Sequence, residues 1–141
     1  MKISCIFVAV LGWLVIAPGW SMADDVTIIV NSSVPVSALS QKDIRNYYLG
    51  RKTTWKDGSK IVFVVQKNSE IHDRFLKDYI GKTAAQFDTF WKKQIFTGNG
   101  APPQSFSSDQ ELVQFVAQTP GALGYVSSGT HTANVKTIAV E

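Results

Sequence analysis

The stretch QTPGALGYV, Gln118 to Val126, places a helix end and a strand start within a few residues of each other. Proline has no backbone N–H and disfavours helical geometry at the residue before it, so Pro120 predicts the end of a helix. Gly121 follows directly, and glycine accepts the positive φ that a sharp turn requires. The stretch therefore predicts a corner between a helix and a strand near Ala122 to Val126. We interpret it as a packing device and not as a site.

Outside this corner, the sequence alternates signals for strands and helices. Continuous apolar and β-branched runs at Val26–Val30 and Ile61–Val65 are typical of buried strands, and Val135–Val140 predicts a last strand. Four polar residues precede apolar residues at helical spacing and predict helix N-termini: Ser40, Ser69, Thr83 and Ser108. Strands separated by helices predict one α/β domain with some parallel pairing.

Large apolar side chains are predicted to fill the core. The helix that begins after Thr83 is expected to bury a stripe of four residues: Phe87, Phe90, Trp91 and Ile95. Four aromatic residues are suited to stacking on a ligand: Tyr47, Tyr48, Trp55 and Trp91. Their positions in helices or turns favour core packing instead.

The first residues predict export. Lys2, an apolar run from Ile3 to Ala17 and the small-residue stretch Ser21-Met22-Ala23 follow the order of a secretory signal peptide. A membrane anchor is the alternative, but a spanning helix needs about 20 apolar residues, and this run is shorter. We expect a signal peptide over residues 1–23, cleaved after Ala23, and a single exported domain over residues 24–141.

Charge, cysteine and histidine content exclude several classes of function. Fourteen Lys and Arg oppose 11 Asp and Glu, and this net charge of +3 is too mild and too scattered for a nucleic-acid-binding protein. The one cysteine, Cys5, lies in the segment expected to be removed. His72 and His131 lack the spacing of metal ligands, and Ser127-Ser128 lack the context of a nucleophile elbow. We therefore expect no enzyme, no metal site and no cofactor.

Three segments stand in a recognisable order along the chain: SALSQKDIRNYYLGRKTTWKDGSKI at 37–61, FWKKQIFTGNG at 90–100 and TPGALGYV at 119–126. In order and approximate spacing they resemble the phosphate-binding proteins of ABC importers, which are periplasmic type II solute-binding proteins. The resemblance covers about Val26 to Ser128. It implies a periplasmic location and an α/β fold in which a central mixed sheet is flanked by helices. Complete members have two lobes around the ligand, and residues 24–141 supply a single lobe.

The ligand motif of this family is only partly present. The family places serine, glycine and threonine at a helix N-terminus, six residues ahead of a phenylalanine, so that hydroxyl and backbone N–H groups face an oxyanion. Ser69 keeps that spacing to Phe75. Glu70 and Ile71 stand where glycine and threonine would be, and the family's arginine is absent from this region.

Two hypotheses about function follow from this comparison. In the first, the chain binds phosphate or a similar oxyanion weakly through Lys67, Asn68 and Ser69 at a helix N-terminus, and it serves a membrane transporter or sensor protein. In the second, it is a degenerate single-lobe domain that acts as a protein-interaction or sensor-accessory module without solute capture. Ser69 is then a plain helix cap.

Overall fold

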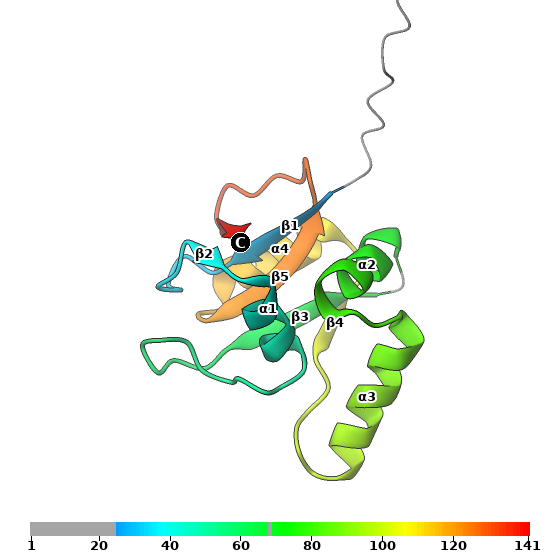
Figure 1. Ribbon diagram of the computed structural model, residues 1–141. Helices are drawn as coiled ribbons and strands as arrows, with labels where there is room; N and C mark the ends of the chain where they lie inside the picture. The colour runs from blue at the N-terminus through cyan, green and yellow to red at the C-terminus, as the bar shows by residue number, and fades with distance from the viewer. Residues whose placement is uncertain (1–24, 68) are drawn as a thin grey trace, which may run out of the picture.

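The computed structural model describes residues 25–67 and 69–141. The expected signal peptide and Asn68 therefore lie outside the described residues. A six-stranded sheet of strand order β2-β6-β1-β5-β3-β4 forms the centre, and helices cover both of its faces (Figure 1). The fold is the predicted α/β architecture with a mixed sheet.

The sheet mixes parallel and antiparallel pairs. Its strands are β1 (Val26–Val30), β2 (Ala38–Leu39), β3 (Val62–Gln66), β4 (Gln104–Phe106), β5 (Ala122–Ser127) and β6 (Lys136–Val140). Strand β1 lies between β5 and β6 and is antiparallel to both. The outer pairs β5·β3, β3·β4 and β6·β2 are parallel.

The helices begin at the predicted residues. They are α1 (Gln41–Tyr48), α2 (Glu70–Phe75), the π-helical turn η1 (Leu76–Ile80), α3 (Ala84–Phe96) and α4 (Asp109–Gln118). Each predicted cap accepts a hydrogen bond from the backbone N–H three residues further on, at 3.0 Å for Ser40, 3.1 Å for Ser69, and 3.2 Å for Thr83 and Ser108. Such a bond satisfies one of the otherwise unpaired N–H groups of the first turn.

The helix predicted to begin at Ser69 continues from α2 into η1 without a break. Leu76, which follows α2, keeps right-handed helical geometry, so η1 continues α2 directly. The Gly81 N–H donates to the Leu76 carbonyl at 2.7 Å, a bond across five residues that widens the last turn. Gly81 then ends the run with a φ of 74°.

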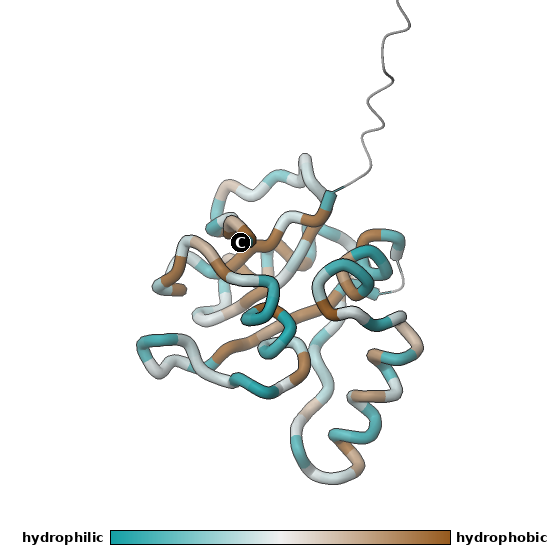
Figure 2. The backbone as a smooth tube through the Cα atoms, in the orientation of Figure 1, coloured by the Kyte–Doolittle hydropathy of each residue, from teal (hydrophilic) through white to brown (hydrophobic). Residues whose placement is uncertain are grey.

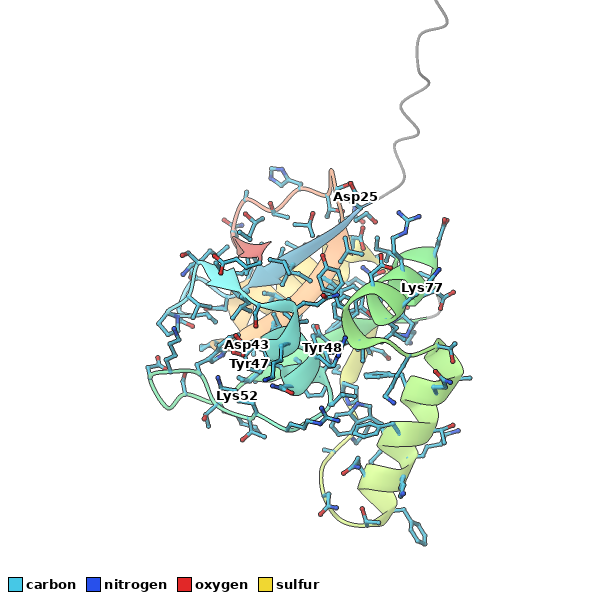
Figure 3. All side chains as sticks on the ribbon, in the orientation of Figure 1. Asp25, Asp43, Tyr47, Tyr48, Lys52 and Lys77 are labelled. Carbon is cyan, nitrogen blue, oxygen red and sulfur yellow. The ribbon has the colours of Figure 1, made fainter. Side chains whose placement is uncertain are left out.

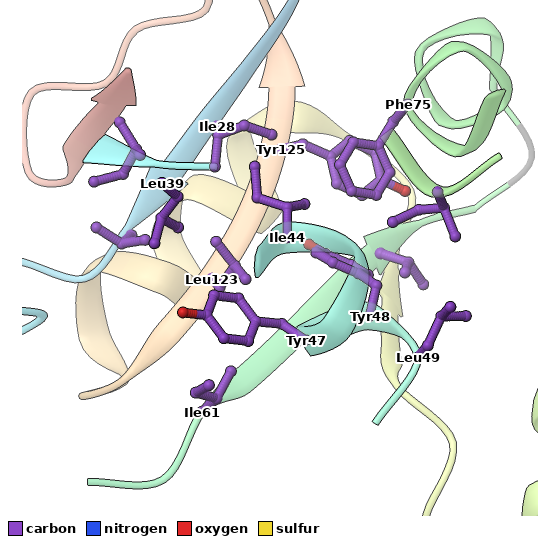
Figure 4. Packing of buried hydrophobic residues seen from close by; sticks show 14 of the residues in the cluster. Ile28, Leu39, Ile44, Tyr47, Tyr48, Leu49, Ile61, Phe75, Leu123 and Tyr125 are labelled. Atoms are coloured by element: carbon purple, nitrogen blue, oxygen red, sulfur yellow. The ribbon is translucent and has the colours of Figure 1, made fainter. Parts of the chain in front are cut away.

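Alternation along the strands divides the core into two layers. One layer packs α1, α2 and η1 on the sheet and includes Ile28, Tyr48, Phe75 and Tyr125 (Figure 4). The other layer packs α4 on the opposite face. The four aromatic residues that suit either ligand stacking or core packing, Tyr47, Tyr48, Trp55 and Trp91, are all buried. The Trp91 Nε1–H donates to the Tyr48 carbonyl at 3.1 Å. The core-packing interpretation of these residues is confirmed.

The corner at Gly121 is a packing device, as the sequence predicts. Gly121 has a φ of 78°, and a Cβ atom there would lie 2.3 Å from the carbonyl oxygen of Lys60. Gly124 has no positive φ; its constraint is steric, because a Cβ atom would lie 2.6 Å from Leu112 Cδ2 on α4. The two glycines thus allow a close approach between the segments that lead into β5 and β3, and a close contact between β5 and α4.

The stripe predicted on α3 is wrong at its C-terminal end. Phe87 and Trp91 are buried, but Phe90 is half-buried and Ile95 is 41% exposed. The physical reason is visible in Figure 1, where α3 extends beyond the edge of the sheet and has no element beneath its last turns. Figure 2 shows apolar and polar segments alternating along this projecting helix.

Candidate functional site

The Ser69 hydroxyl, the centre of the predicted oxyanion site, already has two partners. Its oxygen accepts a hydrogen bond from the His72 backbone N–H at 3.1 Å, and its proton is donated to Gln66 Oε1 at 3.2 Å. The cap role of Ser69 is confirmed. An anion that accepts a hydrogen bond from this hydroxyl would have to replace Gln66 as the acceptor.

Ser69 opens onto a hollow at the edge where α2 and α4 both begin. This hollow, called the polar hollow below, encloses about 280 Å³ and is lined by Gln66, Ser69, Glu70, Ile71, Arg74, Ser107, Ser108, Asp109 and Ser127. The unpaired N–H groups at a helix N-terminus carry partial positive charge, and two such ends face this space. The polar hollow therefore combines hydroxyl groups and helix ends in one place.

Three charged side chains line the polar hollow. Arg74 supplies a guanidinium, whose Nη2 lies 4.0 Å from the Glu70 carboxylate one turn earlier on the helix. Asp109 supplies the second carboxylate. An entering anion would be attracted by Arg74 and the helix ends, and repelled by the two carboxylates.

Asp109 already takes hydrogen bonds from donors around this space. Its Oδ1 accepts from the Gln66 side-chain amide, and its Oδ2 accepts from the Ser127 backbone N–H at 3.2 Å and from the Thr130 hydroxyl at 2.9 Å. Sequence reasoning did not identify Asp109 or Gln66. The only sequence signal for Asp109 is its place after the cap Ser108, which predicts a favourable interaction with the helix dipole and no site.

The structure does not bring the predicted site residues into one hollow. Lys67 is exposed and lines a different space of about 350 Å³ between α3 and the β3–β4 edge. Gln66 borders both spaces, so it separates Lys67 from Ser69. Asn68 lies outside the described residues.

Behind this edge, His72 and Tyr125 form a buried polar pair. The Tyr125 hydroxyl accepts a hydrogen bond from the Gln66 backbone N–H at 3.0 Å, so its own proton is available to His72 Nδ1, which it contacts. Burial lowers the pKa of His72 and raises that of Tyr125, although Asp73 and Asp88 oppose the shift of His72. Burial thus favours the neutral form of His72 inside the core. Within the described residues, no three His, Cys, Asp or Glu side chains gather as a metal site.

The sequence over residues 21–140 matches the family model of the PBP superfamily domain. The chain belongs to this family. It is a family of solute-binding receptors and not a class of enzymes. No curated protein matches the chain.

Solved structures share the fold of this PBP superfamily domain. An ABC-type phosphate transport receptor from Vibrio cholerae is 24% identical with a TM-score of 0.64 over 83% of this chain and 46% of its own. A protein from Clostridium perfringens, assigned as a phosphate ABC transporter substrate-binding protein and holding bound phosphate, is 20% identical with a TM-score of 0.66 over 83% and 45%. PstS from Borrelia burgdorferi is 16% identical with a TM-score of 0.64 over 84% and 47%.

The PBP superfamily domain described here spans less than half the length of each of these structures. It corresponds to a single lobe, as the sequence resemblance implies. No helix within residues 25–67 and 69–141 has the length and apolar character needed to cross a membrane.

Proposed function

We propose that this chain is a periplasmic solute-binding module that holds phosphate or a similar oxyanion weakly in the polar hollow. In this proposal residues 1–23 are a signal peptide cleaved after Ala23, and residues 24–141 are the exported domain. Support comes from the family and from the bound phosphate of the Clostridium perfringens relative in fold. The observation that carries the proposal is the meeting of two helix N-termini, four serines and Arg74 around one space.

The donors of the polar hollow suit a small oxyanion. Each helix N-terminus contributes the equivalent of about half a positive charge, and hydroxyl groups add neutral donors. Ser69 keeps its expected role at the first turn of α2, and Arg74 adds a full charge. Asn68, which is also expected to bind the anion, lies outside the described residues. Lys67 acts from the neighbouring space as a more distant cation.

Two features make the expected affinity low. The carboxylates of Glu70 and Asp109 repel an anion, and Asp109 competes for the same donors. A single lobe also leaves one side of the ligand in water, where hydrogen bonds gain less than in an enclosed site. We therefore expect dissociation constants in the millimolar range.

Calorimetric titration of the purified protein with phosphate and with sulfate tests the proposal. Ser69→Ala removes one neutral hydrogen bond to the ligand, so phosphate affinity should fall tenfold or less, or about 1 kcal/mol. Ser40→Ala is the matched control, because Ser40 caps α1 through the same bond, from the backbone N–H three residues further on, and does not line the polar hollow. Both variants should lose about 1 kcal/mol of stability through the missing cap.

The control separates the two roles of Ser69. Phosphate binding that weakens in Ser69→Ala and persists unchanged in Ser40→Ala assigns the hydroxyl to the ligand. Glu70→Gly, which restores the family residue, should raise the affinity. If wild type, Ser69→Ala and Glu70→Gly all fail to bind millimolar phosphate while Ser69→Ala loses stability, Ser69 is only a cap and the oxyanion proposal is wrong.

A membrane transporter or sensor protein is the proposed partner, because the Vibrio cholerae relative in fold is a transport receptor. A second candidate function is a protein-interaction or sensor-accessory module without solute capture. The position of Asp109 favours it, because this carboxylate already holds donors that a ligand would need.

A further inference from the structure

The C-terminal end of α3 presents apolar side chains to solvent. Among the described residues, three large apolar side chains are exposed: Ile95 at 41%, Phe96 at 92% and Val140 at 37%. Ile95 and Phe96 are adjacent at the end of α3, and exposed Lys92 and Lys93 precede them. We call these four residues the knob. Apolar side chains that gather with charged neighbours on an otherwise polar surface are typical of interaction sites.

The knob directly follows an anchored residue of α3. Trp91, directly before it, is buried, and its indole N–H donates to the Tyr48 carbonyl at 3.1 Å. Beyond this anchor the last turn of α3 projects from the rest of the fold (Figure 3), and Lys92 and Ile95 also line the space of about 350 Å³ that α3 shares with the β3–β4 edge. A preorganised element of this kind loses little conformational freedom when it binds.

The third exposed apolar residue, Val140, lies in a hollow of opposite charge. This acidic hollow encloses about 430 Å³, and Val26, Tyr79 and Val140 form its apolar lining. Its carboxylates belong to Asp25, Asp78 and Glu141, and Arg74 is its one cation among the described residues. The volume exceeds the roughly 150 Å³ cavity that accepts a benzene ring in other proteins.

The carboxylates of this hollow act on its aromatic lining. Burial raises the pKa of Tyr79, and Asp78 and then Asp25 raise it further, because negative charge disfavours the ionised phenol. The acidic hollow therefore places negative charge around an apolar lining. The knob is its counterpart, with two ammonium groups around an apolar tip.

We propose that the knob of one copy of this chain docks in the acidic hollow of a second copy. Phe96 packs against Val140 and Tyr79, and Lys92 and Lys93 face Asp25 and Asp78. The proposal rests on the second candidate function, the protein-interaction module, and is independent of phosphate binding. A second copy is the occupant because the two surfaces complement each other in charge and use all three exposed large apolar side chains of the described chain.

The docking joins different molecules in a head-to-tail manner. Within one chain, Asp25 lies at the top of the view in Figure 3, whereas α3 projects at the opposite end in Figure 1. Each copy then has one free knob and one free acidic hollow, so association is heterologous and can extend beyond a dimer. Because the knob is small, the buried area falls well below the roughly 1,200 Å² of a stable complex, and association is weak.

Sedimentation velocity of the purified protein tests this contact. The weight-average sedimentation coefficient should rise between about 10 μM and about 1 mM, as expected for a small interface. Added salt should reverse the rise, because the Debye length shrinks from about 30 Å at 0.01 M to about 3 Å at 1 M. Lys93→Glu should abolish association, whereas Lys56→Glu, the same charge change on an exposed turn, should not.

A mixing experiment makes the test specific. Phe96→Ser removes the apolar tip of the knob at a residue that is 92% exposed. Asp78→Lys replaces a negative charge of the acidic hollow by a positive one. Each variant alone should stay monomeric. Their equimolar mixture should form a heterodimer and stop there, because only one intact knob and one intact hollow can meet.

Three results would overturn the proposal: a monomeric wild type up to about 1 mM, self-association of Phe96→Ser equal to that of wild type, or no heterodimer in the mixture. A monomeric wild type that sediments with vesicles of anionic phospholipid would assign the knob to a membrane surface instead. Phosphate titration of Phe96→Ser keeps the two proposals apart, since its polar hollow is unchanged.

Discussion

Replacing Gly121 by alanine should strongly destabilise the fold, because two separate penalties meet at this residue. Its φ of 78° is left-handed, a conformation that costs an L-residue about 1–2 kcal/mol. The added Cβ would also lie 2.3 Å from the carbonyl oxygen of Lys60, which is backbone and cannot swing away. Moving that carbonyl would disturb Val62, whose N–H donates to the Gly121 carbonyl at 3.1 Å.

Gly58→Ala separates the two penalties. Gly58 has a φ of 84°, but a Cβ there would have nothing within 4 Å. Both variants share the left-handed penalty and the opposing gain of about 0.4–1 kcal/mol from a stiffer unfolded chain. Their difference therefore measures the close approach to Lys60, and we expect Gly121→Ala to be less stable than Gly58→Ala by about 1–3 kcal/mol.

Equilibrium urea unfolding, followed by circular dichroism and by tryptophan fluorescence, measures this difference. The midpoint for Gly121→Ala should lie clearly below that for Gly58→Ala, with similar denaturant slopes. Coincident midpoints would show that the approach of Gly121 to Lys60 is loose, and the interpretation of QTPGALGYV as a packing device would fail.

Three more substitutions test individual hydrogen bonds and charges of the structure. Asp109→Asn removes a negative charge from the polar hollow, so the affinity for phosphate should rise in calorimetry. The free energy of unfolding should fall by about 1–2 kcal/mol, because the hydrogen bonds to this side chain become weaker. An unchanged affinity would place the ligand elsewhere. Burial holds the pKa of His72 below its ordinary 6.5, so as the pH falls the unfolded chain binds a proton at this histidine before the folded protein does. The urea midpoint should therefore fall as the pH drops below 6.5, and it should fall less in His72→Asn. Trp55→Phe loses the 3.0 Å hydrogen bond to the Gly121 carbonyl and should cost about 1 kcal/mol, since Val62 still donates to that oxygen; a cost near zero would contradict the bond.

Helix starts and long strands were predictable because their signals are local. A cap such as Ser69 bonds to a backbone N–H three residues away, so the residue and its spacing are visible in the sequence. Strand β1 has the predicted bounds, and β3, β5 and β6 each differ by one residue at one or both ends. Strands β2 and β4 were missed, because Ala38–Leu39 is too short for a pattern and Gln104–Phe106 is polar. Their pairing depends on neighbours that are distant in sequence.

The polar hollow was less predictable than the fold. Its hydrogen bond between Gln66 and Asp109 joins residues 43 positions apart and exists only because α2 and α4 begin at the same edge of the sheet. The exposure of Ile95 has a similar cause. Helical periodicity shows which side of α3 is apolar, but it does not show where the sheet beneath that side ends.

The position of β1 in the sheet has a consequence for the order of folding. Among the strands of residues 25–67 and 69–141, β1 pairs only with β5 and β6, the last two strands in the sequence. Both edges of β1 therefore stay open while the intervening chain is synthesised, and closing the sheet requires contacts of high sequence separation, which form slowly. A nascent chain that stops before Ala122 would expose an apolar strand with two free edges, the kind of segment that pairs with other chains and aggregates.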